Sequence, residues 1–446
     1  MHNTTGEKIS SSSIGRREFL RTLGATTVGA AGITGMIGPF DYAGAAITPG
    51  ERGIYITDLR TATIQGNLDH PTTIIRLDTN KAISGYGEVR DNDTSTASQL
   101  STLKPIILGM NPTQVDKVFN AVKSYGVVTP GPNQRNASGG VCAVEMACWD
   151  ITGKVYNVPV WKLIGPKLRD TVRLYADTPV TTPTSALQQQ IQIRLNLGMT
   201  WFKADFGLGM LTSGTDYTTS PETMPAGFGT AYRVNSSGMT KWENYIKSYR
   251  DVIGYTYPLC SDHYGNIDVT TAINVANAMG QMYQMAWMED IVPWYYPDLL
   301  TQINAATDTH ILTGEDMFLR NEFQSLINAK AVDYIHPDQA TSGGIHETRI
   351  LSEWAWANGI STALHFAGTP ISFAANLHIA AGLHGLLALE HHWLDYITWW
   401  QTLGDGLVKP VVQNGYAVIP TGPGLGVVPN PAACTAVLSS GGYFTQ

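Results

Sequence analysis

Six ionisable residues recur at nearly constant intervals in the second half of this 446-residue chain, and this ladder constrains the fold more than any other feature. The gaps between them are 27, 26, 23, 27 and 25 residues, and the six are Asp262, Glu289, Glu315, Asp338, His365 and Glu390. Each lies at, or within three residues of, the end of a short apolar run such as "YPLCSD" or "QMAWMED". A strand, a loop and a helix together need about that many residues, so the ladder predicts successive β/α units. The polar residue of each unit then falls at the carboxyl end of a strand, where a β/α barrel keeps its active site.

The chain is long enough for a barrel of about 250 residues and a second domain. Residues 47–160 show strand patterns first and helical patterns after, which predicts a small α+β domain. Residues 161–395 are predicted to form the barrel, with residues 207–240 as an insertion over its mouth. Residues 396–446 do not continue the barrel pattern, and we expect them to pack back on the first domain.

Residues 1–46 have a different character from the rest of the chain. Arg16 and Arg17, followed by an apolar run rich in small residues and by Ala43-Gly44-Ala45, resemble a twin-arginine export signal with a cleavage site. A short amphipathic helix is the alternative reading of this segment. The apolar run is too short to span a membrane stably, so we expect export to the periplasm or the medium, followed by release.

The formal charge is −8, and the sequence contains no basic cluster. An acidic chain of this kind is a poor partner for nucleic acid or for an anionic membrane, so a small-molecule ligand is expected. The four cysteines show no metal-ligand spacing. Buried free thiols are expected for them, although a disulfide formed after export stays possible.

Several segments, in this order and spacing, resemble the mandelate racemase and muconate lactonizing enzyme family of the enolase superfamily, and in particular its acid-sugar dehydratases. They include "YGEVRD", "GGVCAVEMACWDITGK", "FKADFG", "LCSDHYG", "WMEDIVPW", "LTGED", "IHPDQATSGGI", "LHFAGTP" and "PTGPGLGV". The resemblance covers the chain from residue 47 onward. It implies an α/β fold, in which a modified (β/α)7β barrel is covered by an α+β capping domain formed by the N-terminal region and the C-terminal segment. It also implies a homo-oligomer.

The resemblance also implies the roles of five residues of the ladder. Asp262, Glu289 and Glu315 match the three carboxylates that hold one Mg2+ ion per subunit, and oxygen ligands suit such a hard cation. Asp338 and His365 match a dyad in which the carboxylate orients the imidazole for proton transfer. Together they imply abstraction of a proton next to a carboxylate, with the cation stabilising the negative charge that forms.

Two further positions match the family and one departs from it. Glu390 matches a residue that hydrogen-bonds the developing enolate, for which a carboxylate would need a proton; strand capping is the alternative. Lys203 matches a lysine that neutralises the substrate carboxylate. Members that racemise usually carry a second lysine two residues later, but this chain has Asp205, which is a candidate for substrate binding.

Four other residues are weaker candidates. Strand alternation predicts that Tyr264 points inward with Asp262, as a proton donor or substrate contact, unless it only packs at the barrel mouth. His263 would then point away or into the loop, and it is a minor candidate for substrate binding. Arg135 and Asn136 lie in a predicted polar loop and are candidates to contact substrate hydroxyl or carboxylate groups; a loop that is only solvated is the alternative.

The sequence thus predicts a magnesium-dependent carbon–oxygen lyase that removes water from a sugar acid and yields a 2-keto-3-deoxy acid. A single histidine can take the α-proton and protonate the leaving hydroxyl on the same face, so dehydration tolerates the loss of the second lysine. An epimerase, racemase or cycloisomerase that works through the same enediolate is the first alternative. A non-catalytic exported binding protein that retains the fold is the second.

Overall fold

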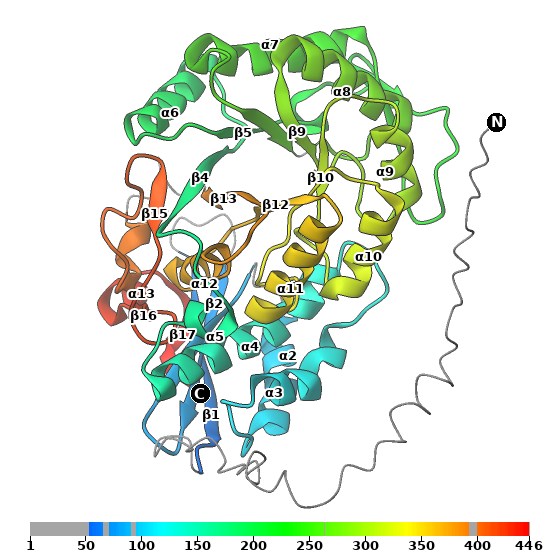
Figure 1. Ribbon diagram of the computed structural model, residues 1–446. Helices are drawn as coiled ribbons and strands as arrows, with labels where there is room; N and C mark the ends of the chain where they lie inside the picture. Colours follow the sequence, from blue (N-terminus) through cyan, green and yellow to red (C-terminus); the bar gives the residue numbers. More distant parts are fainter. Residues whose placement is uncertain (1–52, 66–70, 91–94, 263, 392–398, 446) are drawn as a thin grey trace, which may run out of the picture. The chain divides into compact units, whose positions relative to one another are not determined.

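The computed structural model describes residues 53–65, 71–90, 95–262, 264–391 and 399–445. Figure 1 shows a ring of strands with helices outside it, and a smaller domain drawn in blue and cyan beside the ring. The predicted export signal lies outside the described residues, so it stays a prediction. None of the described helices combines the length and the apolar character needed to cross a bilayer.

Eight parallel strands form a closed barrel, because the last of them pairs with the first. They are β4 (Thr171–Thr178), β5 (Phe202–Asp205), β8 (Leu259–Asp262), β9 (Met285–Glu289), β10 (Ile311–Thr313), β11 (Tyr334–Ile335), β12 (Ser361–Leu364) and β13 (Leu386–His391). Neighbours along the chain are neighbours in the barrel, as successive β/α units require. The predicted fold class is confirmed.

Seven α-helices of the described chain connect these strands on the outside of the barrel (Figure 1). They are α6 (Thr184–Asn196), α7 (Ser236–Ile253), α8 (Val269–Tyr283), α9 (Pro297–Asn304), α10 (Leu319–Ala329), α11 (Gly344–Ala357) and α12 (Pro370–Ala380). The Thr369 side chain accepts the N–H of Ile371 at the start of α12, and Pro370 suits the first helical turn. The helices bury large apolar side chains such as Trp242 and Phe323 against the strands, and each contributes about 2–3 kcal/mol of burial free energy.

The capping domain is an antiparallel sheet packed on helices. Its strands β1 (Ile56–Ile64), β2 (Thr72–Thr79) and β3 (Ser84–Val89) precede α2 (Thr96–Ile107), α3 (Val115–Val122) and the long α4 (Gln134–Tyr156). Strand β3 approaches α4 so closely that a Cβ atom on Gly87 would lie 2.0 Å from the carbonyl oxygen of Ala143. Glycine at this position therefore permits the sheet to lie against the helix.

The C-terminal segment contacts both parts of the molecule. Strand β15 (Tyr416–Val418) pairs with barrel strand β4, and β17 (Leu438–Thr445) joins the edge of the capping sheet beside β1. Between them lie the short β16 (Val428–Pro429), which pairs with β14 (Gly404–Asp405), and α13 (Pro431–Ala436). The barrel strands run from residue 171 to residue 391, but the domain limits drawn from the sequence stay a prediction.

The segment between β5 and α7 contains a small hairpin in place of a short loop. Its strands are β6 (Tyr217–Thr219) and β7 (Tyr232–Val234), which pair with each other. Tyr232 also bridges to Ile267, in the loop that follows barrel strand β8. The hairpin is therefore attached at the carboxyl ends of β5 and β8.

All four cysteines are buried free thiols.

Candidate active site in the barrel lumen

The interior of the barrel has an apolar layer and a polar layer above it. The apolar layer is Tyr175, Trp201, Cys260, Trp287, Leu312, Ala363 and Ala388. Side chains two residues apart on a strand point the same way, so the next inward position along each strand lies toward its carboxyl end. Those positions include Asp177, Lys203, Asp262, Glu289, His365 and Glu390. The alternation therefore stacks the polar layer of the predicted site on an apolar floor.

Lys203 lies at the centre of the polar layer. Its Nζ atom is 2.8 Å from Glu390, 3.1 Å from Glu289, 3.3 Å from Asp262 and 3.7 Å from Asp177. Burial lowers the pKa of Lys203, but the surrounding carboxylates raise it well above its ordinary value. The lumen thus holds a buried ammonium group that stays charged at neutral pH and gathers carboxylates from four strands.

The structure also brings the predicted dyad together. His365 donates a hydrogen bond from Nδ1 to Asp338 Oδ2 at 2.7 Å, and Asp338 in turn accepts the backbone N–H of Ala340. The other ring nitrogen, Nε2, lies 3.1 Å from Glu315 Oε2. Burial lowers the pKa of His365 and the nearby carboxylates raise it, with a net upward shift. Asp338 therefore fixes the tautomer, and Nε2 is the nitrogen that faces the lumen.

Arg90, at the end of capping strand β3, reaches into the same site. Its guanidinium donates to Glu315 at 2.9 Å and lies 3.6 Å from Asp338 and 3.8 Å from Asp316. The sequence did not single out this residue, because it lies in the other domain and outside the regular ladder. The capping domain thus contributes a buried cation between a predicted metal ligand and the dyad.

His336 is a second residue that the sequence analysis missed. It is fully buried, with Nδ1 3.0 Å from Glu289 and Nε2 2.6 Å from the hydroxyl of Tyr175, which donates to Glu390 at 2.8 Å. Burial lowers the pKa of His336, but Glu289 and Glu390 raise it to about 10. The sequence contained a signal for His336, because it directly follows β11 and lies two residues after Tyr334, which packs against the apolar layer.

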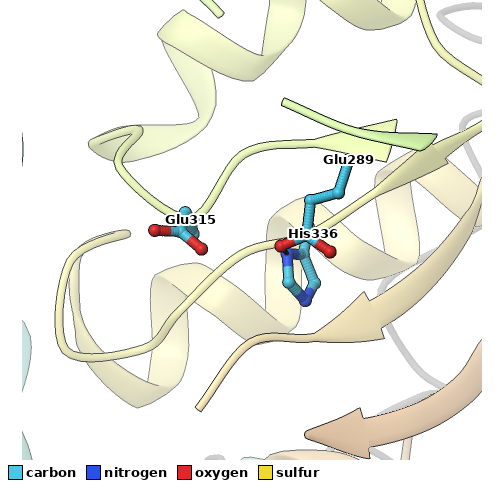
Figure 2. Close-up of side chains that lie close together, drawn as sticks. All are labelled: Glu289, Glu315 and His336. Atoms are coloured by element: carbon cyan, nitrogen blue, oxygen red, sulfur yellow. Dashed lines mark ion pairs between the residues drawn. The ribbon is translucent and has the colours of Figure 1, made fainter. Parts of the chain in front are cut away.

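The acidic groups fit a divalent cation. Potential ligand atoms of Glu289, Glu315 and His336 all lie within 4.8 Å of one another, and Figure 2 shows Glu289 reaching the His336 ring with Glu315 beside them. Asp262 joins this group through Lys203, which contacts both Asp262 and Glu289. Carboxylate oxygens from adjacent strands are the donors that a hard cation prefers. His336 is an additional candidate ligand that the sequence did not predict.

Asp205 is buried in the lumen next to Asp177, with which it shares a hydrogen bond. Burial and the charge of Asp177 together raise the pKa of Asp205 well above its ordinary value. A carboxyl group with a raised pKa therefore lies at the position where the family resemblance implies a second lysine in members that racemise. Glu390 differs: burial raises its pKa, but Lys203 and the neighbouring histidines bring it well below the ordinary value. As an ionised group Glu390 accepts hydrogen bonds, so its predicted donor role would need a proton from elsewhere.

Two of the weaker candidates are not brought into the lumen. The ring of Tyr264 packs against Phe206 and Trp242, and its hydroxyl contacts Ser261, on the outer face of β8. The prediction that Tyr264 points inward was wrong, because β8 ends at Asp262 and the alternation of side chains ends with it.

Asn136 also lies away from the polar layer. It lines a hollow whose walls come from the capping domain: Ser95, Ser98, Gln99, Thr102, Tyr125, Val128, Asn133 and Ala137. Its neighbour Arg135 is nearer the site, 3.8 Å from Asp316, with 38% of its side chain exposed. Consecutive residues of a helix point in different directions, so Arg135 faces the barrel and Asn136 faces the hollow. His263 lies outside the described residues.

Comparison with known families agrees with this architecture. The profile described as "Enolase C-terminal domain-like" matches residues 189–433. The profile of the mandelate racemase and muconate lactonizing enzyme N-terminal domain matches residues 58–165. The chain therefore belongs to the mandelate racemase and muconate lactonizing enzyme family of the enolase superfamily, as its motifs predicted.

Individual relatives are distant but cover most of the chain. A D-xylonate dehydratase of Haloferax volcanii is 27% identical over 85% of this chain and 87% of its own length. A D-galactonate dehydratase family member of Pantoea ananatis is 25% identical over 88% of this chain and 96% of its own.

Solved structures share the fold at lower identity. A mandelate racemase/muconate lactonizing enzyme-like protein of Rubrobacter xylanophilus superposes with a TM-score of 0.77 at 23% identity, over 88% of this chain and 99% of its own. An enolase of Pantoea ananatis with bound D-gluconate and Mg superposes with a TM-score of 0.71 at 24% identity, over 87% of this chain and 96% of its own.

Proposed function

We propose that this protein is a magnesium-dependent dehydratase that removes water from a sugar acid of the aldonate or uronate type to give a 2-keto-3-deoxy acid. The observation that carries the proposal is the pairing of an oriented histidine with an ammonium group and a carboxylate cluster in one lumen. The names of the relatives from Haloferax volcanii and Pantoea ananatis support the substrate class.

Asp262, Glu289 and Glu315 are the residues that would hold the ion, one per subunit. Their oxygens come from the ends of neighbouring strands, and Glu315 also touches the dyad. Magnesium bound there would stabilise the negative charge that develops on the substrate carboxylate. Lys203 adds a buried positive charge beside Asp262 and Glu289, and this preorganised charge stabilises the same oxyanion.

His365 carries the proton. With Nδ1 held by Asp338, Nε2, which lies 3.1 Å from Glu315 Oε2, is the ring nitrogen that would accept the proton α to the substrate carboxylate. The C–H electron pair then forms the enediolate, and the β-hydroxyl departs as water after receiving a proton from the same Nε2. Tautomerisation of the resulting enol gives the 2-keto-3-deoxy acid. Arg135, near Asp316 on the capping side, would contact the distal part of the substrate, and Arg90 would lie closer to the reacting atoms, beside Glu315 and Asp338.

Proton NMR in deuterated water tests the proposal. The protein with Mg2+ is incubated with hexonic, pentonic, uronic and aldaric acids, and His365→Asn serves as the control. Loss of an α-proton signal together with new C3 methylene signals, absent with the control, is the expected result. No ketone product from any acid of the panel would contradict it.

An epimerase, racemase or cycloisomerase is the second candidate, and the buried position of Asp205 on β5, two residues after Lys203, is the observation that favours it. With its pKa raised by burial and by Asp177, Asp205 could return a proton that His365 has removed from another face of the substrate. The same NMR experiment separates the two, because this activity exchanges the α-proton for deuterium without loss of water. Asp205→Asn would then abolish inversion at the α-carbon but leave exchange by His365, whereas a dehydratase that depends on His365 alone would keep turnover.

A further inference from the structure

Two buried glutamates of the capping domain accept hydrogen bonds from the barrel helices that follow the strands leading to Asp338 and His365. Glu88 lies on β3 and Glu145 lies on α4, and both are almost fully shielded from solvent. Neither is part of the polar layer of the lumen. Each accepts hydrogen bonds from the first turn of a barrel helix, where backbone N–H groups have no partner within the helix.

Glu145 holds the start of α11. Its carboxylate accepts the backbone N–H of Ile345 at 2.8 Å and that of His346 at 3.0 Å, and the indole N–H of Trp149 at 2.6 Å. A Cβ atom on Gly344 would lie 2.1 Å from Glu145 Oε2, so this close approach requires glycine there. Burial raises the pKa of Glu145 to about 8, and the N–H groups of His346 and Ile345 oppose that rise.

Glu88 holds the start of α12 in the same manner. It accepts the backbone N–H of Thr369 at 2.9 Å and that of Ser372 at 3.2 Å, together with the Thr369 hydroxyl. Here too a glycine makes room, because a Cβ atom on Gly368 would lie 2.1 Å from Glu88 Oε1. The two glutamates thus make equivalent contacts with successive barrel helices.

Short loops connect these helix starts to the dyad. Asp338 is six residues before Gly344, and its carbonyl accepts the N–H groups of Thr341 and Ser342, which makes the loop compact. His365 is four residues before Thr369, and its own N–H donates to Pro337 O in the preceding strand end. A shift at either helix start is therefore transmitted over few and well-bonded residues to one member of the dyad.

We propose that Glu145 and Glu88 are positioning residues, through which the capping domain sets the distance and angle between Asp338 and His365. Neither glutamate touches the reacting atoms. The expected effect on turnover rests on the proposed function, but the effect on dyad geometry does not. The capping domain in this view aligns the proton-transfer groups as well as covering the site.

A third buried carboxylate of α4 provides a matched control. Asp150 accepts the N–H groups of Leu425 at 2.8 Å and Tyr86 at 3.0 Å, and pairs with Lys154 at 2.6 Å. It shares the burial and helix of Glu145 but holds the C-terminal segment and the backbone of Tyr86 on β3, and it contacts neither dyad loop. Its replacement should reduce stability without moving the dyad.

The test compares Glu145→Gln, Glu88→Gln and Asp150→Asn in the full chain. An amide of the same size presents an N–H group to backbone donors, so each variant loses acceptor capacity without a cavity. The NMR signal of the Nδ1 proton of His365, in protein carrying 15N-labelled histidine and assigned by its loss in His365→Asn, reports the bond to Asp338. Trp149→Phe, which removes one donor from Glu145, serves if the Gln variants do not fold.

We expect the His365 signal to move in the Glu145 and Glu88 variants and to stay at its wild-type position in Asp150→Asn. On a sugar acid turned over by the wild type, kcat should fall by about 100-fold with KM little changed, the loss typical of a misplaced catalytic group. An unmoved His365 signal in both Gln variants would overturn the proposal. Because that signal needs no substrate, it decides the matter even if no sugar acid is turned over.

Discussion

Removal of one buried imidazole should change how the stability of this protein depends on pH. His378 lies in α12, fully buried, where its Nδ1 accepts the backbone N–H of Trp161 at 3.2 Å and its Nε2 donates to the carbonyl of Leu425 at 3.0 Å. This arrangement needs the neutral tautomer with its proton on Nε2. Protonation of Nδ1 would place two N–H groups against each other with no solvent to help.

Burial accordingly lowers the pKa of His378 from 6.5 to about 4, only partly offset by the bond to Leu425. Below about pH 6.5 this histidine is protonated in the unfolded chain but stays neutral in the folded protein. Its contribution to the free energy of unfolding is therefore fully present above that pH and is lost as the pH falls toward 4. With these two values the loss is about 2 kcal/mol at about pH 5, and it approaches 3.4 kcal/mol at still lower pH.

The assay is urea denaturation of the wild type and of His378→Gln at about pH 7.5 and about pH 5, followed by tryptophan fluorescence. Glutamine can accept from Trp161 and donate to Leu425 but does not titrate. Other groups titrate equally in both proteins, so the difference between the two pH-dependent losses isolates His378. We expect the wild type to lose about 2 kcal/mol more than the variant. Equal losses would refute the argument that His378 is held neutral.

Three further predictions concern the lumen. Mg2+ at a hundredfold excess over Kd should raise the free energy of unfolding of the wild type by about 2.7 kcal/mol, seen as a higher midpoint in thermal scans, but should not stabilise Glu289→Gln. The surface variant Asp251→Asn should respond like the wild type. A normal response of Glu289→Gln would argue against the site. Lys203→Met leaves its carboxylate partners without their cation and should cost about 3–5 kcal/mol in denaturant titrations; Mg2+ should restore part of this loss, and an unchanged midpoint would show that Lys203 does not organise the cluster. His365→Asn should abolish α-proton exchange measured by NMR while retaining the Mg2+ stabilisation, and residual exchange at the wild-type rate would assign the proton to another group.

The ladder in the sequence predicted the barrel and most of its polar layer because one physical rule governs both. A β/α unit has a nearly fixed length, and the strand alternation places one side chain per unit at the mouth. The same rule contained the signal for Asp177, on the first barrel strand and two units before Asp262, and for His336, two residues after Tyr334 of β11. The ladder assigned one polar residue to each β/α unit in the second half of the sequence, so it did not include either residue.

Other parts of the site lay beyond what local patterns can predict. Arg90 reaches the lumen from a different domain, and its place depends on how β3 packs on α4 and on the barrel. Tyr264 was misplaced because the alternation was extended past the end of its strand. Charge states such as that of Asp205 arise from burial beside Asp177, a contact between strands that no spacing reveals.

The apolar floor of the barrel determines from which end a small molecule reaches the site. The ring of Trp287 contacts those of Tyr175 and Trp201, with centroids 5.5 and 5.1 Å away, and the three belong to the apolar layer below Lys203. Because side chains fill the barrel at this level, a small molecule reaches Lys203 from the carboxyl ends of the strands, where Arg90 lies. Substrate and product then share one end of the barrel, so product must leave past the capping domain before the next substrate binds.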